Sequence, residues 1–425
     1  MPAPQAHPTF REALRFWLKL GLISFGGPSG QIAIMHTELV EKKKWIDEER
    51  FLHALNYCML LPGPEATQLA TYCGWLLHRT WGGIAAGALF VLPSALLLWL
   101  LSTIYVAYGQ IVWIAAAFAG LKPAVTAIVF AAVIRIGKRA LKTPVTWALA
   151  VVAFIALFFF HAPFPAVIAG AAMIGFLSRN YFSHEVSAPA EMRPMAPVHT
   201  RPSWTRACKV LAISLMLWWL PVLAAGLWHG WHSALVQQGV FFSKAALTTF
   251  GGAYSVLPYV GQQAVETYHW LSAPQMLDGL GLAETTPGPL IMVLQFVGFL
   301  GGWHQPGALS PLLAATLGAA MTTWTTFVPS FLFIFLGAPH IEQLRGVAWL
   351  HHALSAVTAA VVGVILNLAV WFGLNVFFPT QGVVDWFAIG LSTAAFVALQ
   401  RFKVSVLLVV LASALLGMAH HGLAP

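Results

Sequence analysis

The sequence predicts an all-α, polytopic membrane protein made of two homologous halves, arranged as inverted repeats with broken or re-entrant helices. Three observations predict this fold class. The composition is too apolar for a soluble protein, the same motifs return at a fixed spacing, and glycine and proline clusters interrupt apolar segments that are otherwise suited to helices.

The composition requires an apolar environment. The 425 residues are 59% hydrophobic and only 8% charged, whereas soluble domains carry about 25% charged residues. The formal charge of +8 comes from basic residues in short loops between apolar segments, which is typical of cytoplasmic loops. We therefore expect a lipid bilayer and no nucleic acid as a partner. The three scattered cysteines predict neither a disulfide framework nor a metal site.

The apolar segments predict about thirteen membrane crossings, six in each half and one between the halves. We expect an N-terminal half over 1–178, a charged, proline-containing cytoplasmic linker over 179–208, a connecting transmembrane helix over 209–232 and a C-terminal half over 233–425.

The halves repeat each other with a spacing of 225 residues. Phe25-Gly26-Gly27 returns as Phe250-Gly251-Gly252, and Pro62-Gly63-Pro64 returns as Pro287-Gly288-Pro289. The same spacing pairs Trp45 with Trp270 without any gap. Duplicated halves are typical of secondary transporters.

The number of crossings predicts the orientation of the halves. An even number in each half and one crossing between them would invert the second half relative to the first. The basic loops at 135–142, 179–206 and 401–403 would then all be cytoplasmic. The basic cluster Lys42–Lys44 would lie outside the cytoplasm if a single crossing preceded it, which disagrees with the distribution of the other basic loops. Either neighbouring carboxylates mask it, or the first two segments of each half are re-entrant; we favour the second alternative because it preserves the inverted arrangement.

The interrupted segments are candidates for an anion site. Irregular backbone at membrane depth is tolerated only where it is buried in protein or lines a cavity. A half-helix that starts at such a break presents unpaired N–H groups and a dipole that favour an anion. The alternative is a kink that allows close packing, but four breaks in matched register favour a site. The predicted substrate-binding glycines are Gly26, Gly27, Gly63, Gly251, Gly252 and Gly288.

Two lysines occupy matched positions before the breaks. Lys19 and Lys244 each precede a Gly-Gly pair, and a charge at membrane depth is a candidate functional group. A single lysine near a helix end usually extends to the interface, but the exact repetition indicates a shared role in attracting an anion.

Acidic and amide side chains lie close to the same breaks. Glu65 and Glu284 adjoin the two Pro-Gly-Pro motifs and could carry protons, because desolvation favours the neutral form of a carboxyl group; the alternative is structural pairing with lysine. Gln31 and Gln68 could bind oxyanion oxygens or form helix–helix contacts. We expect no catalytic residue, no metal site and no cofactor.

Long motifs in both halves resemble the chromate ion transporter family in its long, two-domain form. The first half contains the run GGPSGQIAIMHTELVEKKKW at 26–45, LLPGPEATQLATYCGW at 60–75 and FVLPS at 90–94. The second half contains FGGAYSVLPYVGQQAVETYHWL at 250–271 and ETTPGPL at 284–290. The resemblance covers nearly the whole chain except the linker.

This resemblance implies efflux of chromate across a bacterial inner membrane, driven by the proton motive force. Antiport would require anion and proton to compete through a glutamate that pairs with Lys19 or Lys244 when the anion is absent. The residues do not distinguish chromate from sulfate, so an importer of sulfate or another oxyanion stays open. A membrane-bound redox enzyme is disfavoured, because the chain has no nucleotide-binding glycine motif. Whether the chain forms a homo-oligomer is left open.

Overall fold

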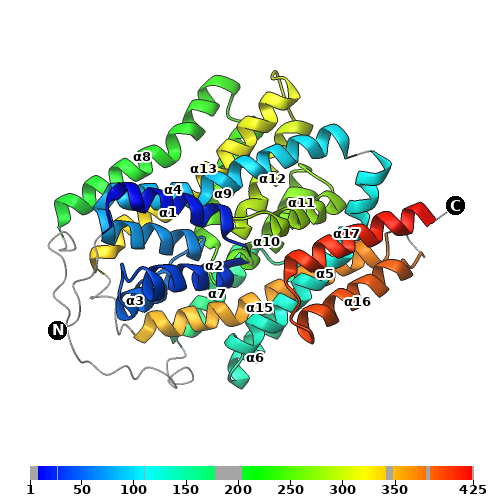
Figure 1. Cartoon of the computed structure of the whole chain (residues 1–425), viewed down its shortest axis with the longest axis horizontal. Helices are drawn as coiled ribbons and strands as arrows, with labels where there is room; N and C mark the ends of the chain where they lie inside the picture. Colours follow the sequence, from blue (N-terminus) through cyan, green and yellow to red (C-terminus); the bar gives the residue numbers. More distant parts are fainter. Residues whose placement is uncertain are drawn as a thin grey trace.

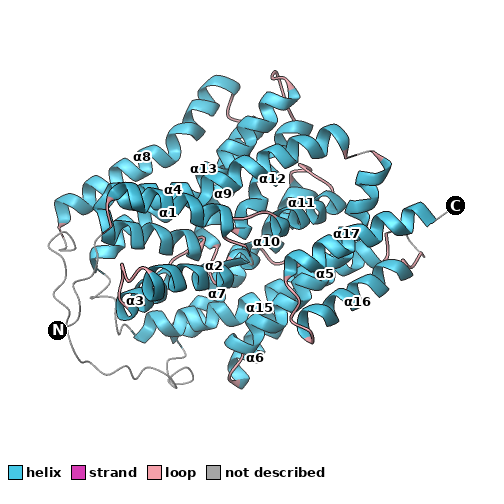
Figure 2. Cartoon of the chain, viewed as in Figure 1, coloured by secondary structure: helices cyan, strands magenta, loops and turns pink. Residues whose placement is uncertain are grey.

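The protein is described by a computed structural model that covers residues 8–25, 27–109, 111–177, 203–340, 348–379 and 383–423. These residues form helices joined by short connections and contain no β-strand (Figures 1 and 2). The predicted all-α class is confirmed.

The first half begins with two segments that are each divided by a break. Helix α1 (Phe10–Ile23) starts at a Thr9–Glu12 capping box, ends before the first break and is followed by α2 (Gly27–His36) and the π-helical turn η1 (Thr37–Lys42). Helix α3 (Glu48–Leu60) ends before the second break, and α4 (Glu65–Tyr108) follows it.

Helix α4 consists of two helices. His78 and Arg79 have non-helical backbone angles, so the chain turns between 65–77 and 80–108. Gly74 and Gly82 face each other across this turn so closely that a Cβ atom on either would collide with the backbone of the other.

The second half repeats this order of elements. It contains α9 (Ala234–Thr248), α10 (Ala253–Gln262), η4 (Gln263–Thr267), α11 (Ala273–Thr285), η5 (Leu290–Met292), α12 (Val293–His304) and α13 (Pro311–Gly337). Even single backbone contacts keep the 225-residue spacing. The Trp45 N–H donates to Leu39 O at 2.9 Å and the Trp270 N–H donates to Ala264 O at 2.8 Å. The duplication is therefore present in the backbone as well as in the motifs.

The remaining helices interlock the halves. The first half contributes α5 (Val112–Ala140), α6 (Pro144–Phe158) and α7 (Phe164–Leu177). The second half contributes α15 (Ala348–Phe377), α16 (Trp386–Gln400) and α17 (Val406–Leu423). Helix α5 packs against α16 and α17, α15 packs against α6 and α7, and α5 and α15 pack against each other. Each half thus covers apolar surface of the other.

The helix that connects the halves starts earlier than predicted. Helix α8 (Trp204–His229) begins inside the expected linker, most of which lies outside the described residues. It packs against α9 and α13 at the edge of the molecule (Figure 1).

Within the described residues, five helices are long and apolar enough to cross a membrane. They lie at Glu65–Tyr108, Val112–Ala140, Trp204–His229, Pro311–Gly337 and His352–Phe377. The half-helices beside the breaks have 10 to 15 residues, or about 15–22 Å, against a hydrocarbon core of about 30 Å. The estimate of thirteen crossings counted each interrupted segment as one continuous membrane span, although the break divides it into two shorter helices.

Reporter fusions are expected to place the ends of the chain on opposite sides of the membrane. In Figure 1, α1 begins at the left of the molecule and α17 ends at the right. The basic residues that close α5, Lys138 and Arg139, predict a cytoplasmic loop. A reporter inserted after Lys142 should therefore be cytoplasmic and one after Pro425 external. A cytoplasmic reporter at Pro425 would contradict the inverted arrangement.

Candidate functional site

The four breaks meet across the two halves. The N–H of Gly63 donates to the carbonyl of Thr249 at 2.7 Å, and the N–H of Gly288 donates to the carbonyl of Ser24 at 2.7 Å. Ser24 and Thr249, like Gly63 and Gly288, are 225 residues apart, so the halves exchange equivalent bonds as a pseudo-twofold axis requires. We call the segments 24–27, 61–64, 249–252 and 286–289 the break cluster; Gly26 lies outside the described residues.

The central glycines of the Pro-Gly-Pro motifs are required by both conformation and space. Gly63 has φ 117° and Gly288 has φ 108°, a region that side chains disfavour. A Cβ atom on Gly63 would lie 2.9 Å from Ser330 Oγ, and one on Gly288 would lie 2.7 Å from Ser94 Oγ. In each case the serine belongs to the other half.

These two serines carry unused hydroxyl groups. Ser94 in α4 and Ser330 in α13 are 0% exposed, and neither Oγ atom has a hydrogen-bond partner among the described residues. The hydroxyls of Ser24 and Thr67, also at the breaks, are equally buried and unpaired. A buried hydroxyl without a partner is costly, and a hydroxyl can rotate to donate to an acceptor. The break cluster therefore has several donors available for a ligand.

Ser94 and Ser330 are not among the site residues predicted from the sequence. The available signal was the Pro-Ser pair, which occurs as Pro93-Ser94 and Pro329-Ser330 after similar apolar residues. Its spacing differs from 225 because the whole segment between the Pro-Gly-Pro motif and the Pro-Ser pair is longer in the second half.

The two predicted glutamines hold the backbone of the breaks. Gln68 Nε2 donates to Pro62 O at 2.7 Å, and Gln31 Nε2 donates to Gly288 O. Their Oε1 atoms are buried without a hydrogen-bond partner among the described residues. These contacts give both amides a structural role, while contact with a substrate stays a prediction.

The two predicted glutamates, which come from different halves, each lie next to a residue at the start of α10. Glu65 begins α4, and its Oε1 lies 3.6 Å from the position of a Cβ atom on Gly252. Glu284, in the last turn of α11, accepts a hydrogen bond from the hydroxyl of Tyr254, the second residue of α10. Glu65 thus lies beside the break at 249–252, and Glu284 binds the side chain of a residue that follows this break.

Arg139 and Arg135 of α5 lie close enough for their charges to influence Glu65 and Glu284, respectively. Within the described residues, neither arginine forms an ion pair with these glutamates. The arginines are four residues apart, so they share one face of the helix, and both are exposed. From the sequence, these arginines predict only the orientation of the chain, because nothing in the linear order shows which helices pack against α5.

The predicted lysines are placed differently. Lys19 and Lys244 are both exposed, and neither forms an ion pair with Glu65 or Glu284, although all four residues are described. Lys19 continues an exposed basic stripe with Arg11 and Arg15 along α1. Their role in attracting an anion stays a prediction.

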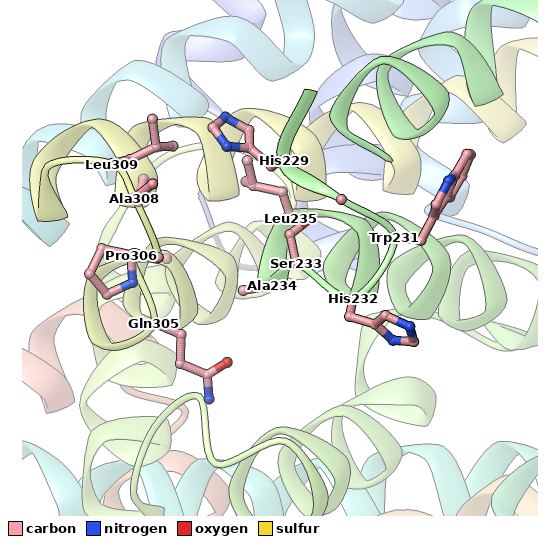
Figure 3. Close-up of a pocket in the computed structure, with 14 residues that line it drawn as sticks. His229, Trp231, His232, Ser233, Ala234, Leu235, Gln305, Pro306, Ala308 and Leu309 are labelled. Atoms are coloured by element: carbon pink, nitrogen blue, oxygen red, sulfur yellow. The ribbon is translucent and has the colours of Figure 1, made fainter. Parts of the chain in front are cut away.

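A cavity of about 380 Å³ lies elsewhere, between the connections that follow α8 and α12. Figure 3 shows His229, His232, Ser233 and Gln305 around it. It shares no lining residue with the break cluster, so we do not assign the candidate site to it.

Comparison with known proteins shows the family of this chain. The family model described as chromate transporter matches residues 11–176 and 236–418. The chain is 33% identical to the chromate transport protein of Pseudomonas aeruginosa, over 98% of this chain and 93% of that protein. It is 28% identical to the chromate transport protein of Cupriavidus metallidurans, over 98% and 94%, and 25% identical to an uncharacterized transporter of Methanocaldococcus jannaschii, over 97% and 94%. No solved structure matches. Two family matches in two repeated halves, together with full-length relatives, show that this membrane protein belongs to the chromate transporter family.

Proposed function

We propose that the protein exports chromate or a similar oxyanion from the cytoplasm across a bacterial inner membrane, coupled to protons. The observation that carries this proposal is the break cluster, where four helix breaks from two halves meet around buried hydroxyls without partners. The names of the full-length relatives support chromate as the substrate.

The chemistry of the break cluster suits an oxyanion. Chromate and sulfate present four oxygen acceptors and two negative charges. The hydroxyls of Ser94 and Ser330 can donate to these oxygens, the N-terminus of α10 favours an anion, and Arg135 and Arg139 can neutralise the charge. The two anions share shape and charge, so both belong in the test.

The membrane potential favours export. A charge that leaves an inside-negative compartment gains about 2.3 kcal/mol per 100 mV, so a dianion gains roughly twice as much. Uptake of the same anion would need at least that much free energy from coupled cations.

The arrangement of charges predicts the sign of the proton coupling. Arg135 and Arg139 can pair with Glu284 and Glu65 or with the anion, so an anion that takes the arginines leaves the carboxylates unpaired and favours their protonation. Binding of the anion therefore strengthens binding of the proton and the reverse, as thermodynamic linkage requires. The proton then travels with the anion. This proposal differs from the expected competition through a Glu–Lys pair, because neither Lys19 nor Lys244 forms an ion pair with these glutamates among the described residues. Each proton cancels one charge of the dianion, so potential-driven export requires fewer than two protons per anion.

Flux measurements in proteoliposomes test the function. Labelled chromate and labelled sulfate are followed separately, with and without an imposed potential and pH gradient. We expect chromate to leave the compartment that faces the cytoplasmic side, faster when that side is negative. Accumulation on the cytoplasmic side against such a potential would identify an importer, and absence of flux for both anions would overturn the proposal.

Removing the arginines is expected to weaken anion binding far more than removing the lysines. All four side chains are exposed. Arg135→Gln/Arg139→Gln takes away the two charges that this proposal assigns to the anion, whereas Lys19→Gln/Lys244→Gln takes away two charges that pair with neither glutamate among the described residues. Chromate affinity at fixed ionic strength measures the difference. A larger loss from the lysine pair would return the anion-attracting role to Lys19 and Lys244.

A further inference from the structure

A second buried carboxyl group lies away from the break cluster. Asp278 is in α11 and is 4% exposed. Its Oδ2 accepts a hydrogen bond from the hydroxyl of Tyr105 at 2.9 Å, and its Oδ1 lies 3.7 Å from Lys122 Nζ. The three residues join α4 and α5 of the first half to α11 of the second half.

The carboxyl group is only partly satisfied. A separation of 3.7 Å is too long for a hydrogen bond, and Oδ1 has no hydrogen-bond partner among the described residues. A buried ion pair offsets its desolvation only with good geometry and further hydrogen bonds. The pair therefore gives little stability, and a charge at membrane depth is a candidate functional group.

The free oxygen suits a proton better than a metal ion. The ammonium group of Lys122 already lies next to Oδ1, and the described residues contain no group of three or more His, Cys, Asp or Glu side chains that could hold a metal ion. A proton on Oδ1 would neutralise Asp278 and release Lys122, whose side chain is 26% exposed and can be solvated. Tyr105 and Lys122 are the titratable groups that contact Asp278 from the packed helices within the described part of the chain.

We propose that Asp278 is a second proton-binding site, which controls the contact between the halves and acts on the break cluster through α11. Asp278 and Glu284 lie on this helix six residues apart, or about 9 Å along its axis. When Asp278 is ionised, the pair with Lys122 ties α11 to α5; when Asp278 is protonated, the tie is lost. The role of Asp278 in transport rests on the proposed proton-coupled function, whereas the existence of the proton-binding site does not.

Infrared difference spectroscopy of the purified protein tests the site without any anion. We expect the wild-type protein to show a carbonyl band of a protonated carboxyl group that changes between an acidic and an alkaline sample. Asp278→Asn should lose that component, while Glu266→Gln, which changes an exposed carboxylate, should keep it. Persistence of the full band in Asp278→Asn would overturn the proposal.

Flux measurements test whether protonation of Asp278 affects transport. Asp278→Asn/Lys122→Met removes both charges, so no unpaired charge is left to unfold the protein. We expect this double variant to transport with a flattened pH dependence, and Lys122→Arg, which keeps the pair, to retain the wild-type profile. A wild-type pH profile in the double variant would reduce the pair to a structural contact. If Asp278→Asn loses the infrared component while the wild-type protein transports neither chromate nor sulfate, the proton site stands and only the proposed function is refuted.

Discussion

Replacing Ser94 and Ser330 together by alanine is expected to abolish oxyanion transport without lowering the stability of the protein. Both hydroxyls are buried and unpaired, and an unsatisfied buried polar group costs about 1–3 kcal/mol. Their removal should therefore leave the thermal unfolding temperature unchanged or raise it. A hydrogen bond to a charged group contributes about 1.5–3 kcal/mol, so each hydroxyl should account for roughly a 10- to 150-fold change in anion affinity.

Ser243→Ala is the matched control for this prediction. The hydroxyl of Ser243 accepts a hydrogen bond from Trp218 Nε1 at 2.9 Å and donates to Gly239 O at 2.6 Å. Its loss should lower the unfolding temperature and leave chromate affinity unchanged. If the Ser94/Ser330 double variant instead loses stability and keeps its affinity, the two hydroxyls serve packing and the break cluster does not bind the anion through them.

Replacing Glu65 and Glu284 by glutamine is expected to remove the response of transport to a pH gradient. In the wild-type protein, anion and protons support each other's binding, so acidification of the cytoplasmic side should accelerate export. Glutamine keeps the size of the side chain but cannot take up a proton. The double variant should therefore export chromate at a rate that follows the potential and not the pH gradient.

Glu266→Gln is the control, because Glu266 is exposed and lies in η4. It should respond to a pH gradient as the wild-type protein does. The measurement is chromate efflux from proteoliposomes at a clamped potential, with the pH of one compartment varied. An unchanged response in Glu65→Gln/Glu284→Gln would show that neither glutamate couples protons. A response of opposite sign in the wild-type protein would show that proton and anion compete.

The sequence by itself determined the repeated architecture and the place of the candidate site. An apolar composition without enough charge for a soluble surface requires a bilayer, and the 225-residue repeat requires two similar halves. The Gly-Gly and Pro-Gly-Pro motifs interrupt helices for local reasons, since proline removes a backbone donor and glycine permits positive φ. The structure places positive φ at Gly27, Gly63, Gly251, Gly252 and Gly288. Such local backbone rules need no knowledge of the partner segment.

Only the tertiary structure decided which residues face one another. The exchange of bonds between Gly63 and Thr249 and between Gly288 and Ser24 joins positions that are far apart in the chain. Repetition alone suggested a shared role for Lys19 and Lys244, yet among the described residues neither lysine pairs with Glu65 or Glu284, and Glu65 lies beside Gly252 of the other half. The glutamates have no acidic counterparts at the 225-residue spacing, because Leu290 and Met59 occupy those positions. Which helices become neighbours depends on how their apolar faces pack together. The order of charged residues along the chain does not show which faces will meet.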